Sequence, residues 1–187
     1  MNLKNDFERA TPFPRYLEEV VKNHALWNGL YDRARVPEDL VEAAVEAADE
    51  AGGSFRLLAL SEDWCGDAVN ALPFVARWAE AVPGMELRVL ARDENLELMD
   101  AHLTDGRSRS IPVVMVLDPE GEEVGWWGPR PLKLQQWVLG EGQEMSSDER
   151  YKVARRWYAR DKGRAVVEEI LEIITGAEDS RSRRRSA

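Results

Sequence analysis

The chain has 187 residues, of which 35 are acidic and 25 are lysine or arginine, so its formal net charge is −10. This excess of negative charge disfavours nucleic acid as a partner. The single cysteine, Cys65, excludes an internal disulfide, a cysteine-rich zinc site and any reaction that needs two thiols of one chain. No apolar run approaches the length of a membrane helix, and the N-terminal residues lack the apolar stretch of a signal peptide. We therefore expect a cytoplasmic protein that does not bind membranes and whose thiol stays reduced.

Residues 1–36 are predicted to form an N-terminal helical extension. Pro12 and Pro14 exclude the interior of an early helix. From Tyr16 to Trp27, apolar residues recur at helical spacing, which predicts one helix over this stretch.

A strand–helix–strand unit follows, preceded by another helix. The stretch 37–51 is amphipathic and predicts a helix that ends at a pair of glycines. The short apolar run 55–60 indicates a buried strand, and 65–81 a helix that Pro73 should kink. Residues 85–90 indicate a second strand, which we expect to lie parallel to the first because a helix connects the two.

A hairpin completes the predicted sheet. After a helix over 93–103, the β-branched run 112–117 indicates a central strand. The sequence 118–121 is Asp-Pro-Glu-Gly, which is typical of a type I turn, and 122–127 returns as the second arm. The predicted fold class is therefore α/β, with a mixed central sheet of about four strands and helices on both faces.

The remaining residues are predicted to be helical and then unstructured. A helix over 132–139 is followed by a C-terminal helical extension at 141–176, in which Ser146 and Glu149 form a capping-box pattern. The tail 177–187 is rich in arginine and has no apolar residue beyond alanine, so we expect it to be disordered.

The lone cysteine lies in the segment 61–68, Ser-Glu-Asp-Trp-Cys-Gly-Asp-Ala, where a buried strand meets the start of a helix. The first-turn N–H groups and the helix dipole should stabilise a thiolate and lower the pKa of Cys65. Asp67 would raise that pKa, accept the thiol proton, or serve only as an acid at the helix start. A lone cysteine is often a small buried apolar residue, but this position favours a nucleophile.

Three features resemble the thioredoxin family. The run 64–68, Trp-Cys-Gly-Asp-Ala, resembles that family's Trp-Cys-Gly-Pro-Cys motif after an apolar strand. Pro73 matches the kinking proline of the active-site helix, and Ile111-Pro112 resembles the family's cis-proline loop. The resemblance covers a domain of residues 37–140 and implies a thioredoxin-like fold. More narrowly, the motif and the terminal helices resemble an uncharacterised bacterial subgroup of thioredoxin-like proteins.

The sequence departs from the family at three positions. Ala68 stands where the family has its resolving cysteine, so this chain cannot release a mixed disulfide with a second thiol of its own. The family's buried acid falls at Ala59, and its lysine partner falls near Val89. General dithiol activity is therefore not implied.

Two functions remain open at this point. The resemblance implies a monothiol thiol–disulfide oxidoreductase in which Cys65 is the nucleophile, Pro112 shapes the opposite wall, Trp64 shields the sulfur and Asp67 tunes protonation. No cofactor is expected, although glutathione or another low-molecular-weight thiol could resolve the mixed disulfide. The partner would then be a disulfide- or thiol-containing protein or a small thiol. The alternative is a non-catalytic binding module whose terminal helices form a homodimer or a docking surface.

Other candidate residues carry weaker signals. His24 and His102 show no metal-ligand spacing with the cysteine, so no metal site is expected. Trp126 and Trp127 should point to opposite faces of a strand, one into the core and one toward a helix or the surface. Arg109 could hold a glutathione carboxylate or offset the acidity of the motif.

Overall fold

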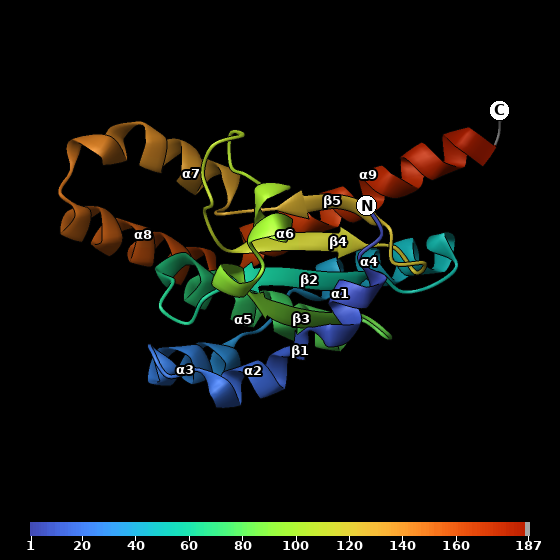
Figure 1. Ribbon diagram of the computed structural model, residues 1–187, viewed down its shortest axis with the longest axis horizontal. Helices are drawn as coiled ribbons and strands as arrows, with labels where there is room; N and C mark the ends of the chain where they lie inside the picture. The colour runs from blue at the N-terminus through green and yellow to red at the C-terminus, as the bar shows by residue number, and fades with distance from the viewer. Residues whose placement is uncertain (186–187) are drawn as a thin grey trace.

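The computed structural model describes residues 1–185, with side chains up to residue 177. Within this part of the chain, the strands form one five-stranded sheet in the order β1-β3-β2-β4-β5 (Figure 1). The strands are β1 (Thr11–Pro12), β2 (Arg56–Ser61), β3 (Glu86–Ala91), β4 (Val113–Leu117) and β5 (Glu123–Trp127). The α-helices are α1 (Lys4–Arg9), α2 (Phe13–Glu19), α3 (His24–Arg33), α4 (Glu38–Ala51), α5 (Gly66–Ala81), α6 (Leu96–Asp100), α7 (Leu132–Leu139), α8 (Ser147–Asp161) and α9 (Arg164–Arg185). Short 3-10 helices are η1 (Arg92–Glu94) and η2 (Glu141–Glu144).

The sheet is mixed, which confirms the predicted α/β class. β2 and β3 are parallel and are joined through α5, whereas β4 is antiparallel to β2 and β5 is antiparallel to β4. The sheet has five strands where about four were predicted. The additional strand, β1, pairs antiparallel with the outer edge of β3. It has two residues and ends in Pro12, so it is too short to show an alternating pattern.

The strand register defines the two faces of the sheet. Trp126 and Arg88 lie on the same face, since paired residues in neighbouring strands share a side. On this face the Arg88 guanidinium lies 4.7 Å from the ring centroid of Phe7 in α1. The His102 ring, just after α6, meets Trp126 edge to face at 5.8 Å. α1 and α6 therefore cover this side.

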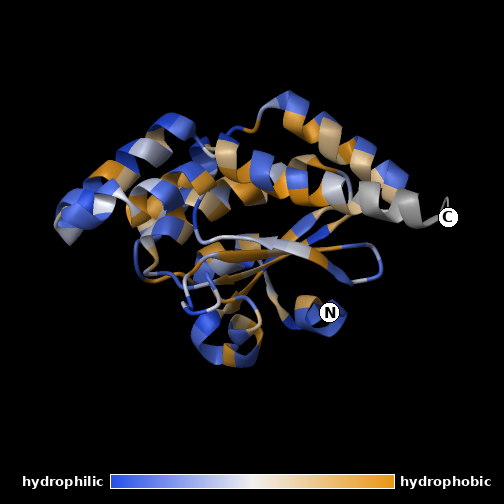
Figure 2. Cartoon of the chain, turned by 90° about the horizontal axis from the view of Figure 1, so that it is seen from above, coloured by the Kyte–Doolittle hydropathy of each residue, from blue (hydrophilic) through white to orange (hydrophobic). Residues whose placement is uncertain are grey.

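The opposite face is covered by α4, α5 and α9. Trp127 points to it and donates its indole N–H to Glu169 of α9 at 2.7 Å. α4 and α9 pack against each other, and Trp78 of α5 donates to the carbonyl of Leu40 in α4. Figure 2 shows helices on either side of the sheet. As predicted, the two adjacent tryptophans lie on opposite faces.

The N-terminal extension is divided more finely than the sequence predicted. Instead of one helix from Tyr16 to Trp27, α2 ends at Glu19 and α3 begins at His24. Asn23, in the left-handed region with φ 58°, separates them. Pro14 occupies the first turn of α2, a position that tolerates a missing N–H.

The C-terminal segment is two helices joined at a glycine. Gly163, with φ +79°, separates α8 from α9, and the predicted capping box of Ser146 and Glu149 is present at the start of α8. α9 packs on α4 and β5, so the segment 141–176 contributes one of the helices that cover the sheet. α9 also continues to Arg185 through most of the tail predicted to be disordered; residues 186–187 lie outside the described part. None of the helices in the described part is long and apolar enough to cross a membrane.

Candidate functional site

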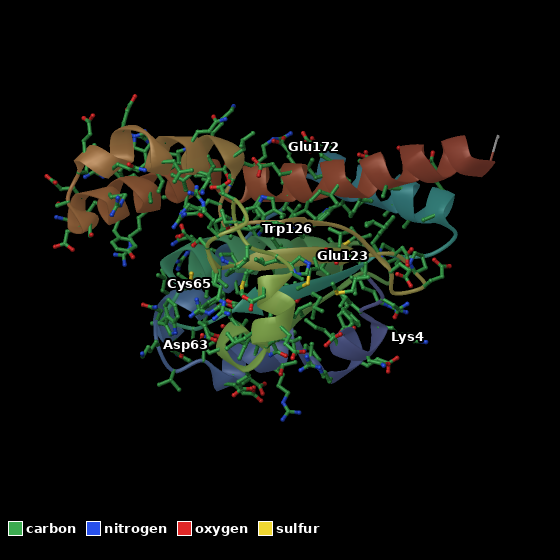
Figure 3. All side chains as sticks on the ribbon, turned by 45° about the horizontal axis from the view of Figure 1, so that its top comes forward. Lys4, Asp63, Cys65, Glu123, Trp126 and Glu172 are labelled. Atoms are coloured by element: carbon green, nitrogen blue, oxygen red, sulfur yellow. The ribbon has the colours of Figure 1, made fainter. Side chains whose placement is uncertain are left out.

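Cys65 is the N-cap residue of α5 and lies at the carboxyl end of β2, the same end of the sheet as Asp63 (Figure 3). Its Sγ accepts a hydrogen bond from the backbone N–H of Ala68 at 3.5 Å. Its thiol donates to the carbonyl oxygen of Ile111 at 3.3 Å. The peptide bond between Ile111 and Pro112 is cis. The tertiary fold therefore brings together Cys65, the candidate nucleophile, and the proline loop, which lies 46 residues away in the sequence.

The turn after β5 packs against the proline loop at Gly128. Gly128 has φ +140°, and a Cβ atom at this position would overlap the carbonyl oxygen of Pro112. Only glycine adopts this backbone conformation without strain and leaves room for that oxygen. The turn after β5 is thereby packed directly on the wall that faces the sulfur.

Burial dominates the acidity of the thiol. Cys65 is 7% exposed, and burial raises the pKa of its thiol, an effect to which the negative charge of Asp67 adds. The backbone N–H groups of Ala68 and Asp67 and the positive charge of Arg130 lower it, but they do not overcome burial. The lowered thiol pKa predicted from the helix start is therefore not what the structure gives, because the sequence carries no measure of desolvation.

Asp67 lies in a buried network that the sequence did not reveal. It is 9% exposed, its Oδ2 pairs with Nη2 of Arg130 at 2.7 Å, and its Oδ1 accepts from the Tyr158 hydroxyl at 3.1 Å. Burial raises the pKa of Asp67, while Arg130 and Tyr158 act to lower it. Asp67 is thus more than an acid at a helix start: it joins α5 to the turn after β5 and to α8.

No sequence signal pointed to the two partners of Asp67. Arg130 stands in Gly128-Pro129-Arg130-Pro131, which marks only a break between strand and helix. Tyr158 is one of several aromatic residues on a predicted helix, 91 residues from Asp67. The peptide bond between Gly128 and Pro129, directly before Arg130, is cis, a feature that the sequence did not predict.

The family's acid–lysine pair is replaced by apolar residues. The register pairs Ala59 with Val89 across β2 and β3, and both are at most 2% exposed. Ala68 is completely buried, so the position of a resolving thiol faces the interior. The carboxylate that acts on Cys65 is therefore Asp67, which follows it in α5.

Trp64 lies at the surface of the site. It is 44% exposed, and the Arg92 guanidinium lies over its ring, 5.3 Å from the centroid. This cation–π contact holds the indole between the motif and the end of β3. That Trp64 shields the sulfur stays a prediction.

Asp63 anchors the N-terminal extension to the motif. Its carboxylate accepts the backbone N–H groups of Val21 and Lys22 at 3.0 and 2.8 Å. Its carbonyl accepts the indole N–H of Trp27 at 3.0 Å. The segment between α2 and α3 is thereby fixed beside the cysteine.

The remaining candidates have other partners. Arg109 forms two hydrogen bonds with Asp100, at 2.6 and 2.8 Å, so its guanidinium is occupied. His24 is exposed in α3, whereas His102 is buried and bonded to Glu123 at 2.8 Å. Across the described residues, no group of three or more histidine, cysteine or acidic side chains is placed to hold a metal ion.

A small cleft of about 200 Å³ opens beside the motif. Trp64, Gly66 and Asp67 contribute its motif side, and α8 contributes Tyr151 and Tyr158. The C-terminal helices therefore form part of the immediate surroundings of the cysteine.

Comparison with known proteins agrees with this geometry. A crystal structure of an HIV epitope scaffold superposes with a TM-score of 0.68 at 20% identity, over 94% of this chain and 99% of that chain. A protein of unknown function from Pseudomonas aeruginosa gives 0.67 at 20% identity, over 91% and 95%. At this identity the likeness shows the fold alone. No curated protein matches the chain. The family model described as thioredoxin matches residues 10–163, most of the chain, and the chain therefore belongs to the thioredoxin family.

Proposed function

We propose that this protein carries out thiol–disulfide exchange through Cys65 alone, with an external thiol completing the reaction. One observation carries the proposal: Sγ of Cys65 lies 3.3 Å from the carbonyl oxygen of Ile111, directly before the cis bond to Pro112. A nucleophile against a proline wall suits an extended partner chain, whose disulfide would enter from the side of Trp64.

The exchange takes place in two displacements. The Cys65 thiol loses its proton to solvent, and the thiolate attacks one sulfur of a disulfide R–S–S–R′. A protein–S–S–R bond forms as the R–S–S–R′ bond breaks, and R′–S⁻ leaves and takes up a proton. A small thiolate R″–S⁻ then attacks the R sulfur, which releases R–S–S–R″ and regenerates Cys65. The substrate disulfide is exchanged, and no net electrons remain on the protein.

The second thiol has to come from outside because Ala68 carries none. We place the reaction in the cytoplasm, where low-molecular-weight thiols such as glutathione are kept reduced. The buried position of Cys65 and the raised pKa of its thiol make the exchange slow at neutral pH and faster as the pH rises, since only the thiolate attacks.

A binding module is the second candidate, and the same burial favours it. A thiol with a raised pKa, bonded to a backbone carbonyl, also fits a structural cysteine in a fold that has lost turnover. In that case the proline loop and the cleft would bind a partner without covalent chemistry.

Incubation with glutathione disulfide separates the two candidates. Intact-mass spectrometry across pH 7–9 should show one glutathione adduct, formed faster at higher pH, absent from Cys65→Ser and reversed by reduced glutathione. Failure of the folded protein to form an adduct even at pH 9 would rule out exchange and leave the binding module.

Restoring the missing thiol gives an independent test. The backbone N–H of Ala68 already contacts Sγ of Cys65, and residues three apart in a helix start lie within disulfide reach. Ala68→Cys should therefore form an internal disulfide and reduce insulin in the presence of dithiothreitol faster than the unmodified chain. A variant that forms the disulfide yet shows no gain in reduction would contradict the proposed geometry.

A further inference from the structure

We propose that the groove between α3, α5 and α8 binds a small amphiphilic carboxylate, such as a medium-chain fatty acid. The groove has a volume of about 570 Å³. Sites for small organic ligands typically have volumes of about 300–1,000 Å³. The site stands on its own geometry and does not depend on exchange at Cys65.

The floor and walls of the groove offer apolar surface. Leu26 and Leu30 line it from α3, Phe74 from α5 and Ala159 from α8. α5 contacts both α3 and α8, and Figure 1 shows it between these two helices. Residues of all three helices line the groove. Burying an alkyl chain against this surface would remove apolar area from water, which favours binding.

The rim of the groove is cationic on both walls. Arg33 and Arg35 lie at and just after the end of α3, and Arg155 and Lys162 lie on and just after α8. All four are exposed, and among the described side chains no acidic residue lines the groove. A cluster of four cations is unexpected in a chain with a net charge of −10.

These four cations also lack acidic partners. Arg35 donates only to the backbone carbonyls of Asp32 and Ala34, and within the described side chains none of the four forms an ion pair. An unpaired guanidinium group is free to bind a carboxylate, which arginine holds through two parallel hydrogen bonds. The rim is therefore complementary to an anionic head group.

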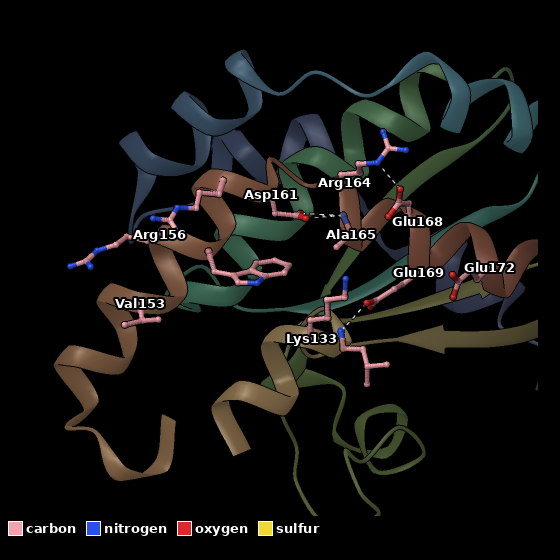
Figure 4. A pocket seen from close by; sticks show the side chains of 12 residues that line it. Lys133, Val153, Arg156, Asp161, Arg164, Ala165, Glu168, Glu169 and Glu172 are labelled. Carbon is pink, nitrogen blue, oxygen red and sulfur yellow. Dashed lines mark hydrogen bonds and ion pairs between the residues drawn. The ribbon is translucent and has the colours of Figure 1, made fainter. Parts of the chain in front are cut away.

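A second groove shows that this charge pattern is not general. The groove of about 860 Å³ between α7, α8 and α9 is lined by equal numbers of cationic and acidic side chains (Figure 4). There Arg164 pairs with Glu168 at 2.6 Å, and Glu169 accepts the backbone N–H of Leu132. Charges of both signs line this larger groove, so it lacks the uniformly cationic rim of the groove over α5.

The volume of the groove and the charge of its rim together indicate which class of ligand it binds. Three turns of an amphipathic helix, about 10–12 Å wide with side chains, occupy more volume than the roughly 570 Å³ of this groove. A single acidic head on an apolar body matches the arrangement of a cationic rim above an apolar floor. The groove also shares Tyr158 and Asn70 with the cleft beside Cys65, so a ligand would lie next to the motif.

Fluorescence of 8-anilinonaphthalene-1-sulfonate, itself an apolar anion, provides the test on the full-length protein. Decanoate should displace the probe at least tenfold more tightly than 1-decanol, and decylammonium should not displace it. The double variant Arg33→Gln/Arg155→Gln should weaken decanoate binding at least tenfold. Arg156→Gln, one residue further along α8 and lining the other groove, should leave it unchanged.

Three outcomes would overturn the proposal. They are equal affinity for decanoate and 1-decanol, equal effects of the double variant and Arg156→Gln, and no displacement of the probe by any of the three ligands. Circular dichroism of each variant establishes that it is folded. If Arg33→Gln/Arg155→Gln fails to fold, Lys162→Gln supplies the same test with an expected threefold or greater loss.

Discussion

Replacing Arg130 with methionine removes the cation that neutralises Asp67 beside the cysteine. The side chains of Asp67 and Arg130 are 12% and 24% exposed, so both have lost most of their hydration. Breaking a buried ion pair on one side costs about 3–5 kcal/mol. Because the Tyr158 hydroxyl still donates to Asp67 and some water reaches the pair, we expect Arg130→Met to lose about 2–3 kcal/mol of unfolding free energy at pH 7.

Urea denaturation measures this loss, and Arg77→Met provides the matched control. Arg77 pairs with Glu80 at the same 2.7 Å distance, but their side chains are 39% and 37% exposed. An exposed pair of this kind contributes about 1 kcal/mol or less. If the two variants lose the same stability within about 0.5 kcal/mol, burial is not what makes the Asp67 pair important.

The pH dependence gives a second check on the same variant. Burial already raises the pKa of Asp67, and loss of the Arg130 charge raises it further. A carboxyl group whose pKa is higher in the folded than in the unfolded chain favours folding when protonated, so its stability falls as pH rises through that interval. The deficit of Arg130→Met should therefore shrink toward acid pH, and a constant deficit would contradict this account.

The pKa of the single thiol, Cys65, responds to the charges of the same ion pair. Arg130 lowers the pKa of Cys65 and Asp67 raises it, so Arg130→Met should raise the thiol pKa and Asp67→Asn should lower it. Alkylation by iodoacetamide as a function of pH follows Cys65 alone because the chain has no other thiol. If both variants shift the pKa of Cys65 in the same direction, the substitutions act through a change of conformation and not through charge.

Three further changes test the framework of the site. Gly128→Ala should cost at least about 2 kcal/mol in urea denaturation, because its Cβ would overlap the carbonyl of Pro112 and its φ of +140° is strained for alanine. His102→Gln should cost about 1–3 kcal/mol near pH 6 by leaving Glu123 without its partner. Burial lowers the pKa of His102, but its bonds to Glu123 and a backbone carbonyl raise it by more. The wild-type chain should therefore lose this stabilisation as pH rises through the folded pKa, and the variant should not. Asp63→Ala should lower stability by about 1 kcal/mol and expose the N-terminal extension to limited proteolysis.

Matched control variants define the results that would contradict these three predictions. Gly176→Ala, where a Cβ meets nothing within 4 Å, should be neutral or slightly stabilising, so an equal loss at Gly128 and Gly176 would contradict the packing argument. A wild-type pH profile identical to that of His102→Gln would show that the imidazole does not ionise in this range. Asp63→Asn keeps one acceptor oxygen and should lose less than Asp63→Ala.

Local patterns in the sequence were enough for most of the fold. Apolar periodicity located β2, α5, β3, β4 and β5 to within a residue or two, and the motif around Cys65 with Pro73 and Ile111-Pro112 identified the family. Each of these features depends on residues that are close together in the chain, so the sequence predicts it directly. The edge strand β1 and the break at Asn23 were missed because two residues of pairing and one left-handed residue leave no periodic trace.

The order of residues was sufficient to place the single thiol, Cys65, at a strand-to-helix junction and to show that Ala68 cannot resolve its disulfide. The acidity of that thiol and the surroundings of Asp67 depend on the folded chain. Arg130 and Tyr158 reach the site from segments far along the chain, and burial of Cys65 outweighs the helix start that should have lowered its pKa. Desolvation and long-range charge depend on what the whole chain packs around an atom, and a local pattern does not contain that information.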